Sequence, residues 1–505
     1  MISTIVLIVV VLALWAGAWQ IESLRGRQLL LLLGSYVFYF WFGGTMLAML
    51  VASSLVNFRL GRLVRTLRLE FLWLAVGLNI VLIAAFKYLP PILDAAGSPS
   101  QADLARRIVI PVGMSFWTFQ ALSYHIDTYL EDVGQPSLLE FCLYMAFWPT
   151  VISGPVCRLP EMLPQFRRTP QFSRQDLSDG VLQIIQGVCM KFYLAQLLAS
   201  GWSRGAGVTA GFDATVGWGG LDVWLLAVGY GFQLFFDFAG YSLMVIGVAR
   251  VFGIRLPQNF NRPYLSLTPA IFWTRWHMSL SFWIRDYVFR PLSAMRRDKW
   301  WLYVSLLIAM TLFGLWHGAR WTFMLWGIYQ GLLLVGHRMG QRAKKWASIQ
   351  VPPALGACLA WATTFAFVSL GYVFFRASSL AQLGTMLEAA LTPSSYRHVV
   401  LPQAYYQLTI TVVAGYFLVA GGSALLRSWR ARYRAADKSR VASTSLIPLT
   451  WADVPYTAGA TVDFLATSLW WWLAPALVTL GGLAALATYI QSARIATTPF
   501  IYTLF

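Results

Sequence analysis

Apolar segments long enough to cross a lipid bilayer recur along nearly the whole sequence, from Ile2 to about Ile490. A transmembrane helix needs roughly 20 mainly apolar residues, and inside hydrocarbon only a helix or a closed barrel satisfies the backbone hydrogen bonds. Only 11% of the residues are charged, against about 25% in a typical soluble domain. The sequence therefore predicts an all-α, polytopic membrane protein with about ten to thirteen spans.

Basic residues concentrate in short stretches between the apolar segments. One cluster lies between Arg59 and Arg68, another between Arg338 and Lys345, and the densest begins at Arg427. Positively charged loops of membrane proteins face the cytoplasm. We therefore interpret the net charge of +18 as an orientation signal in a bacterial cytoplasmic (inner) membrane, and we expect no nucleic-acid binding.

The two ends of the chain have distinct patterns. The first apolar segment lacks a basic region before it and a small-residue cleavage site after it, so we expect it to remain as an anchor. Near the other end, residues 427–463 form a basic, polar stretch that predicts a cytoplasmic linker. Residues 464–505 contain one more apolar span and end in TTPFIYTLF. A single span after a cytoplasmic linker places this tail outside the cytoplasm.

Two histidines lie in segments dense with tryptophan and arginine, and they are the candidate catalytic residues. His317 occurs in LFGLWHGARWTF, after a long apolar run, with Gly314 and Gly318 permitting close approach of the backbone. His277 occurs in FWTRWHMSLSFWIRDYVFRPL. A neutral imidazole can take a proton from an attacking hydroxyl. An apolar, partly dry position therefore suits a general base.

Each histidine also has a structural interpretation. An intramembrane His317 can serve only to hydrogen-bond two helices. The segment around His277 also has the pattern of an amphipathic helix at the membrane interface. We expect His125 to be structural and paired with Asp127 or Asp132.

Several charged residues interrupt apolar sequence, where they are costly and often mark a cavity or a substrate path. Lys87 and Arg376 have side chains long enough to reach the interface, and we expect both to do so. Asp237, in FQLFFDFAGY, cannot reach as far. It either pairs with a cation, such as an arginine of the His277 segment, or lines a wet cavity.

The sequence lacks the motifs of several other classes. It contains no GxSxG elbow, Walker loop or HExxH, which argues against a hydrolase, an ATPase and a zinc protease. The four cysteines have no CxxC or Cys/His spacing, so we predict packing residues and no metal site. No pair of matched broken halves favours a secondary transporter. A flippase or transporter for a lipid-linked glycan, and a structural scaffold for polysaccharide export, remain the alternatives.

The longest motifs resemble the membrane-bound O-acyltransferase family, in particular its bacterial alginate O-acetyltransferase subunits and D-alanyl transfer proteins. The resemblance is carried by PVGMSFWTFQALSYHIDTY, GYGFQLFFDFAGYSLMVIGVARVFGIRLPQNFNRPY, FWTRWHMSLSFWIRDYVFRPL, LWHGARWTF and YVFFRA. It assigns residues 1–426 to the acyltransferase core and implies a ring of helices around a funnel and a tunnel. It also implies that His317 is catalytic and that His277 is a second functional position. The candidate substrate-binding residues lie in the same motifs: Trp316, Trp276, Arg285, Asp286 and Asp237.

The resemblance implies a membrane O-acyltransferase that passes an acyl group across the membrane onto a cell-envelope or exported polysaccharide. The expected donor is a cytoplasmic thioester, either acetyl-CoA or an acylated phosphopantetheinyl acyl-carrier protein, with no bound cofactor. The expected partner is an extracytoplasmic serine transferase of the SGNH type. The motifs mix the acetyl and D-alanyl kinds, so the acyl group stays open.

The C-terminal tail resembles the end of the small single-span partner protein of the D-alanyl system. A tyrosine in that motif is thought to accept the acyl group, and the matching position here is Tyr502. The alternative is an aromatic tail that only anchors at the membrane interface.

Overall fold

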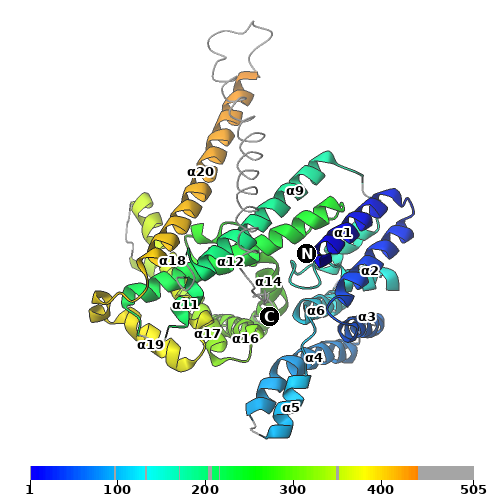
Figure 1. The fold of residues 1–505 in the computed structure, drawn as a ribbon, viewed down its shortest axis with the longest axis horizontal. Coiled ribbons are helices and arrows are strands. Elements are labelled where there is room, and N and C mark those ends of the chain that lie inside the picture. Colours follow the sequence, from blue (N-terminus) through cyan, green and yellow to red (C-terminus); the bar gives the residue numbers. More distant parts are fainter. Residues whose placement is uncertain are drawn as a thin grey trace. The chain divides into compact units, whose positions relative to one another are not determined.

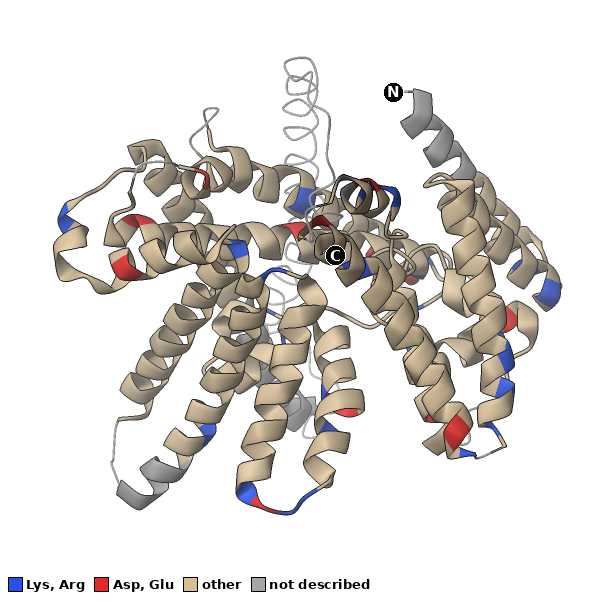
Figure 2. Ribbon diagram, turned by 90° about the horizontal axis from the view of Figure 1, so that it is seen from below, with Lys and Arg blue, Asp and Glu red and all other residues tan. Residues whose placement is uncertain are grey.

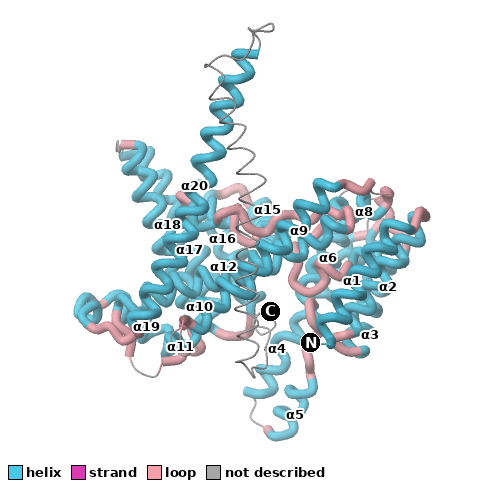
Figure 3. Tube along the Cα trace, turned by 45° about the horizontal axis from the view of Figure 1, so that its top comes forward, coloured by secondary structure: helices cyan, strands magenta, loops and turns pink. Residues whose placement is uncertain are grey.

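The computed structural model describes residues 2–66, 68–95, 98–130, 134–169, 171–202, 207–214, 217–347 and 352–441. Every regular element in these ranges is a helix, as Figure 3 shows. Tyr502, the predicted last span and most of the predicted linker lie outside the described residues.

Seven helices in the described part of the chain are long and apolar enough to cross a membrane. They are α3 (Gly44–Val64), α4 (Leu69–Ala95), α9 with its continuation (Arg174–Ser200), α12 (Gly220–Val251), α16 (Lys299–His317), α18 (Pro353–Arg376) and the first part of α20 (Gln403–Gly422). Ten to thirteen spans were expected. The difference arises partly because α2 (Leu24–Phe40) and α6 (Met114–Leu130) have only 17 residues each.

Charged residues lie mainly at helix ends and in loops, whereas the bodies of the helices are almost free of them (Figure 2). Charges at the centre of a bilayer are costly, while those at helix ends reach water or headgroups. The all-helical structure, the long apolar helices and this distribution of charge describe a multi-pass membrane protein, as the sequence predicts.

The chain divides into two compact units, and the larger contains residues 1–187 and 241–392. Its helices not yet named are α1 (Ile2–Gln20), α5 (Pro99–Arg107), α7 (Leu138–Ala146), α8 (Leu159–Phe166), α13 (Pro269–Trp273), α14 (Met278–Ile284), α15 (Arg290–Ala294), α17 (Trp321–Ala347) and α19 (Leu380–Leu391). Near its start, α1 packs on α2 and α2 on α3 (Figure 1). The short helix α7 packs against α2 and α3 and buries Phe141 completely.

A tight hairpin of α16 and α17 forms another part of the larger unit. Gly314 of α16 faces Gly327 of α17 so closely that a Cβ atom on Gly314 would lie 2.3 Å from the carbonyl oxygen of Phe323. Small residues at such a crossing let two membrane helices approach with backbone contact. This contact fixes the last turn of α16, which ends at His317.

The smaller unit contains residues 188–240 and, within the described part, 393–441. It includes the π-helical turn Cys189–Ala195, α10 (Gln196–Ser200), α11 (Val208–Phe212) and α20 (Gln403–Val441). Its two chain segments are joined at the buried Asp222, which accepts hydrogen bonds from the backbone N–H groups of Val400 and Leu401 and from the hydroxyl of Tyr406. Helix α20 extends through residues 427–441, so the start of the predicted linker is helical.

Candidate active site

His317 ends α16, and aromatic rings enclose its imidazole. The ring centroids lie 4.6 Å away for Trp316, 4.8 Å for Phe375 and 5.2 Å for Phe313 and Trp326. The side chain is 8% exposed. This enclosure keeps bulk water from the imidazole, which is the environment that the sequence predicts for a general base.

Two side chains of α4 hold the C-terminal turn of α16. The ammonium group of Lys87 donates a hydrogen bond to the carbonyl oxygen of Trp316, and the hydroxyl of Tyr88 donates one to the carbonyl oxygen of Leu315 at 2.5 Å. The last carbonyls of a helix lack the usual i+4 N–H donor, and a cation at a helix C-terminus is favourable. The Leu315 carbonyl also accepts from the Gly318 N–H at 3.1 Å. Lys87 also interacts electrostatically with His317.

The expectation that Lys87 reaches the membrane interface is wrong. Its side chain is buried, 9% exposed, and the ammonium group lies 5.2 Å from the centroid of the Trp316 ring. The only signal in the sequence was a lysine within an apolar helix. Its partner is more than 200 residues away along the chain, and no sequence pattern connects the two.

His277 is buried and has an unusual backbone conformation. It is 2% exposed and has φ 41° and ψ 55°, in the left-handed region, immediately before α14. Non-glycine residues adopt this conformation rarely, and such residues cluster at functional sites. Asn259 fixes the turn, since its carbonyl oxygen accepts from the Met278 N–H at 2.8 Å and its side chain accepts from the Ser279 hydroxyl at 2.6 Å.

The two histidines are close enough to interact electrostatically. The burial of the His277 imidazole argues against the interpretation of its segment as an interfacial helix. The structure therefore brings together the two histidines that the sequence singles out, and their catalytic role stays a prediction.

The predicted tryptophans both lie in aromatic layers beside these histidines. Trp276 stacks on Phe272 with 5.4 Å between ring centroids and meets Phe260 edge-on at 5.2 Å. Trp316 stacks on Phe313 at 6.0 Å and packs against Phe119 at 5.5 Å. Both indoles are almost fully buried. They shape the apolar surroundings of the histidines.

Arg285 and Asp286 belong to a cluster of arginines around one carboxylate. Asp286 accepts from Arg285 at 2.8 Å, from Arg158 at 2.7 Å and from Arg290 at 2.9 Å. Burial alone would raise the pKa of Asp286, but the hydrogen bonds from Arg285 and Arg158 outweigh it and hold that pKa below its usual value. Asp286 is therefore ionised at neutral pH. The sequence analysis did not identify Arg158 and Arg290.

Asp237 has a cation partner, but it is not an arginine of the His277 segment. The ammonium group of Lys191 lies 2.5 Å from its carboxylate, and both residues belong to the smaller unit. Lys191 lies in the π-helical turn Cys189–Ala195. Such turns occur mostly as single bulges within α-helices. Of the two alternatives for Asp237, the structure shows the ion pair, with Lys191 as the cation in place of an arginine of the His277 segment.

His125 is fully buried, but its partner is Asn57 and not Asp127. Its Nε2 atom lies 2.8 Å from the side-chain oxygen of Asn57, which also accepts from Asn79 at 2.7 Å. This contact joins α3, α4 and α6. Asp127 instead accepts a hydrogen bond from the hydroxyl of Tyr287 at 2.7 Å, and Asp132 lies outside the described residues.

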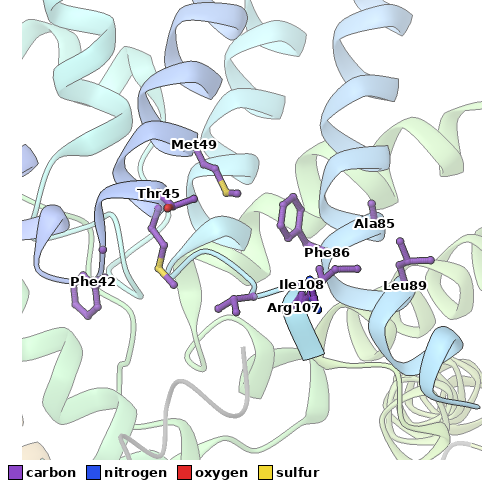
Figure 4. A pocket seen from close by; sticks show the side chains of 11 residues that line it. Phe42, Thr45, Met49, Ala85, Phe86, Leu89, Arg107 and Ile108 are labelled. Atoms are coloured by element: carbon purple, nitrogen blue, oxygen red, sulfur yellow. The ribbon is translucent and has the colours of Figure 1, made fainter. Parts of the chain in front are cut away.

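A separate apolar pocket of about 600 Å³ lies in the larger unit, where Met49 of α3 and Phe86 of α4 face it from either side (Figure 4). Arg107 contributes the charged group of its lining. None of the predicted site residues lines it. Among the described residues, no group of three or more His, Cys, Asp or Glu side chains is placed to hold a metal ion.

Comparisons with known proteins find two family models that match separate parts of the chain. The model of the membrane-bound O-acyltransferase family (MBOAT) matches residues 1–380. A family of unknown function (DUF5989) matches residues 459–505.

Three curated relatives illustrate the similarity. The probable alginate O-acetylase AlgI of Pseudomonas putida is 32% identical over 489 residues, which cover 92% of this chain and 96% of the relative. The peptidoglycan O-acetyltransferase of Helicobacter pylori is 31% identical over 386 residues, which cover 70% of this chain and 71% of the relative. The teichoic acid D-alanyltransferase of Streptococcus thermophilus is 35% identical, over 46% of this chain and 58% of the relative.

Proposed function

The chain belongs to the membrane-bound O-acyltransferase family and is an acyltransferase, and we propose that it transfers an acyl group from a cytoplasmic thioester across the membrane. The final acceptor in this proposal is a hydroxyl of a cell-envelope or exported polysaccharide. Relatives named for alginate, peptidoglycan and teichoic acid support an envelope polymer. A multi-pass membrane protein can connect a cytoplasmic donor with an external acceptor.

The position of His317 is the observation that carries this proposal. The imidazole is enclosed by aromatic rings, ends a helix whose last carbonyls are bound by Lys87 and Tyr88, and lies near His277. An imidazole held in this way can take a proton from a hydroxyl that comes within hydrogen-bond reach. We assign His317 as the general base and His277 as a second functional residue.

The proposed chemistry is acyl transfer from sulfur to oxygen. His317 takes the proton of the attacking hydroxyl while the oxygen forms a bond to the thioester carbonyl carbon. The carbon–sulfur bond then breaks, and the imidazolium returns the proton to the departing thiolate. No oxidant or reductant is needed, and the imidazole ends the cycle neutral.

Tyr502 is our candidate for the attacking hydroxyl. A phenol has a pKa of about 10, so it requires a nearby base to act as a nucleophile at neutral pH. The match of residues 459–505 to a separate family supports a distinct module at this end of the chain. The acyl-tyrosine ester would then be passed to an extracytoplasmic serine transferase of the SGNH type.

The coverage of the relatives favours acetyl as the acyl group. The two O-acetylating relatives align over 92% and 70% of this chain, whereas the D-alanyltransferase aligns over 46%. The donor is then acetyl-CoA or an acetylated phosphopantetheinyl carrier protein.

The test measures the amount and mass of acyl groups that mild base releases from envelope polysaccharide. His317→Ala and Tyr502→Phe are compared with wild type, and His337→Ala, a partly exposed histidine of α17, is the control. We expect loss in the first two variants and a released mass corresponding to acetate. If only His317→Ala loses acylation, Tyr502 is not the acceptor. Undiminished acylation in His317→Ala overturns the proposal.

A further inference from the structure

Three guanidinium groups converge on the single carboxylate of Asp286. Arg158 comes from the start of α8, Arg285 from the π-helical turn Arg285–Phe289, and Arg290 from the start of α15. Their nitrogen atoms lie 2.7 to 2.9 Å from the oxygens of Asp286. One negative charge cannot neutralise three positive ones.

Two other carboxylates, those of Asp127 and Glu161, lie near this cluster and accept hydrogen bonds from neutral donors. Both carboxylate oxygens of Asp127 lie within hydrogen-bond distance of the Tyr287 hydroxyl, at 2.7 and 2.8 Å. Glu161 faces the backbone N–H of Arg158 at the start of α8. A further cation, Arg338, lies 5.9 Å from the ring of Phe289 in the same π-helical turn. Four cations, Arg158, Arg285, Arg290 and Arg338, therefore face three carboxylates, those of Asp286, Asp127 and Glu161, so these groups together carry a net positive charge.

The outer arginines are open to a ligand. The side chain of Arg290 is 64% exposed and that of Arg285 is 45% exposed, whereas Asp286 beneath them is 14% exposed. Each guanidinium has five N–H donors in a planar fork. Asp286 occupies only some of them, and the fork geometry matches the oxygens of a phosphate.

A continuous series of aromatic contacts leads from this cluster to His317. The guanidinium of Arg158 lies 4.9 Å from the ring of Tyr287, which packs at 5.1 Å against Trp283. Trp283 lies 4.4 Å from Phe119, Phe119 lies 5.5 Å from Trp316, and Trp316 lies 4.6 Å from His317. Trp283, Phe119 and Trp316 are almost fully buried, so this series gives the direction in which an apolar chain held at the cluster would approach His317.

The distance of the arginine cluster from His277 and the position of the cluster beside a basic loop agree with a ligand that enters from the cytoplasm. Asp286 follows His277 by nine residues, which corresponds to roughly 13 Å along a helix, and His277 in turn interacts electrostatically with His317. Arg290 precedes Arg296, Arg297 and Lys299, and such a basic stretch faces the cytoplasm. His317 lies at the opposite end of the helix that starts at Lys299.

We propose that Arg285 and Arg290, with Arg158 behind them, bind the phosphate of phosphopantetheine in the thioester donor. The pantetheine arm, whose two amide units and carbon chains extend over roughly 15 Å, would follow the aromatic contacts and bring the thioester to His317. Coenzyme A and an acyl-carrier protein both contain this phosphate. The inference rests on the proposed function and names the part of the donor that this chain recognises.

The experiment uses the purified full-length chain and three donors: acetyl-CoA, an acetylated carrier protein, and acetyl-pantetheine, which lacks the phosphate. The readout is the rate of the single acetylation of Tyr502, so that KM and kcat here denote the half-saturating donor concentration and the maximal rate of that step. The variant is Arg285→Gln with Arg290→Gln. Arg296→Gln, a basic residue that packs on the ring of Trp301, is the matched control. Comparison of acetyl-CoA with the carrier protein identifies which source of the phosphate the wild type uses.

We expect the double variant to raise the KM for the phosphate-bearing donor about tenfold or more, because two charge-assisted contacts are lost. Its kcat and its turnover of acetyl-pantetheine should match those of wild type, which also shows that the variant is folded. Arg296→Gln should keep the wild-type KM for the phosphate-bearing donor.

If the double variant has an unchanged KM for the phosphate-bearing donor, the inference is overturned. It is also overturned if the double variant loses as much activity with acetyl-pantetheine as with the phosphate-bearing donor, because that would reveal a general structural defect. Failure of the proposed function is distinguishable, because His317→Ala would then still turn over all three donors.

Discussion

Substitution of Gly314 by alanine is expected to disturb the active site without touching any reacting group. A Cβ atom there would lie 2.3 Å from the carbonyl oxygen of Phe323 and 2.9 Å from the Cα atom of Gly327. Both neighbours are backbone atoms and cannot rotate away. Because ordinary van der Waals contact begins near 3.4 Å, α16 and α17 would have to separate by about 1 Å.

The separation acts directly on His317, which lies three residues after Gly314 and is packed against Phe323 and Trp326 of α17. A misplacement of about 1 Å at a catalytic group can lower a rate about a hundredfold. Overpacking of a helix contact costs about 1–3 kcal/mol in stability. We therefore expect a much larger loss of acyl transfer than of folded protein.

The assay is the rate of acyl transfer by purified Gly314→Ala, normalised to folded protein and accompanied by its thermal unfolding midpoint. Gly336→Ala is the matched control, because Gly336 lies on α17 and has open space around its missing Cβ. The control should transfer at the wild-type rate. A Gly314→Ala variant with wild-type rate and unfolding midpoint would refute the claim that this contact positions His317.

Three further predictions follow from other contacts of the described residues. Lys87→Met should lower the rate of acyl transfer about tenfold in the same assay. Lys87→Arg should keep part of that rate, because a cation again reaches the end of α16. Equal rates for both variants would contradict a role for the positive charge. Lys191→Met should lower the yield of folded protein, since it leaves the partly buried Asp237 unpaired. A second change in the same chain, Asp237→Asn, should recover that yield. A lower yield of folded protein for the double variant than for Lys191→Met would argue against a stabilising Lys191–Asp237 ion pair. For Glu140, burial alone would raise the pKa, but hydrogen bonds from Arg167 and Ser137 hold it below its usual value. A carboxyl with a lowered folded-state pKa stabilises the fold above its unfolded pKa of about 4.3, and this contribution is lost as the pH falls through the folded-state pKa, which lies below that value. Unfolding scans of Glu140→Gln should therefore show a smaller stability loss than wild type as the pH falls from about 5 to about 3.

The sequence predicts the class of fold and singles out His277 and His317 as candidate site residues, because both inferences depend on local patterns. Long apolar runs specify membrane helices, and His317 stands out as an imidazole between tryptophans and glycines. The count of spans is less predictable. Helices of 17 residues, such as α2 and α6, lie at the lower limit of the length that crosses a bilayer.

The partners of buried polar groups were not predictable, because they depend on contacts between distant segments. A cation for Asp237 follows from the cost of an isolated charge in a membrane, but the sequence does not distinguish Lys191 from the arginines near His277. Lys87 has a partner in α16 that only the folded chain brings near. The same holds for Arg158, which joins Asp286 across 128 positions of the sequence.

The central claim is that His317 activates an acyl acceptor on this same chain. It is tested most directly by incubating the purified protein with a labelled acetyl thioester and locating the label by peptide mass analysis. We expect a base-labile acetyl group on Tyr502 in wild type and none in His317→Ala. Equal labelling of Tyr502 in His317→Ala would contradict the assignment of His317 as the general base.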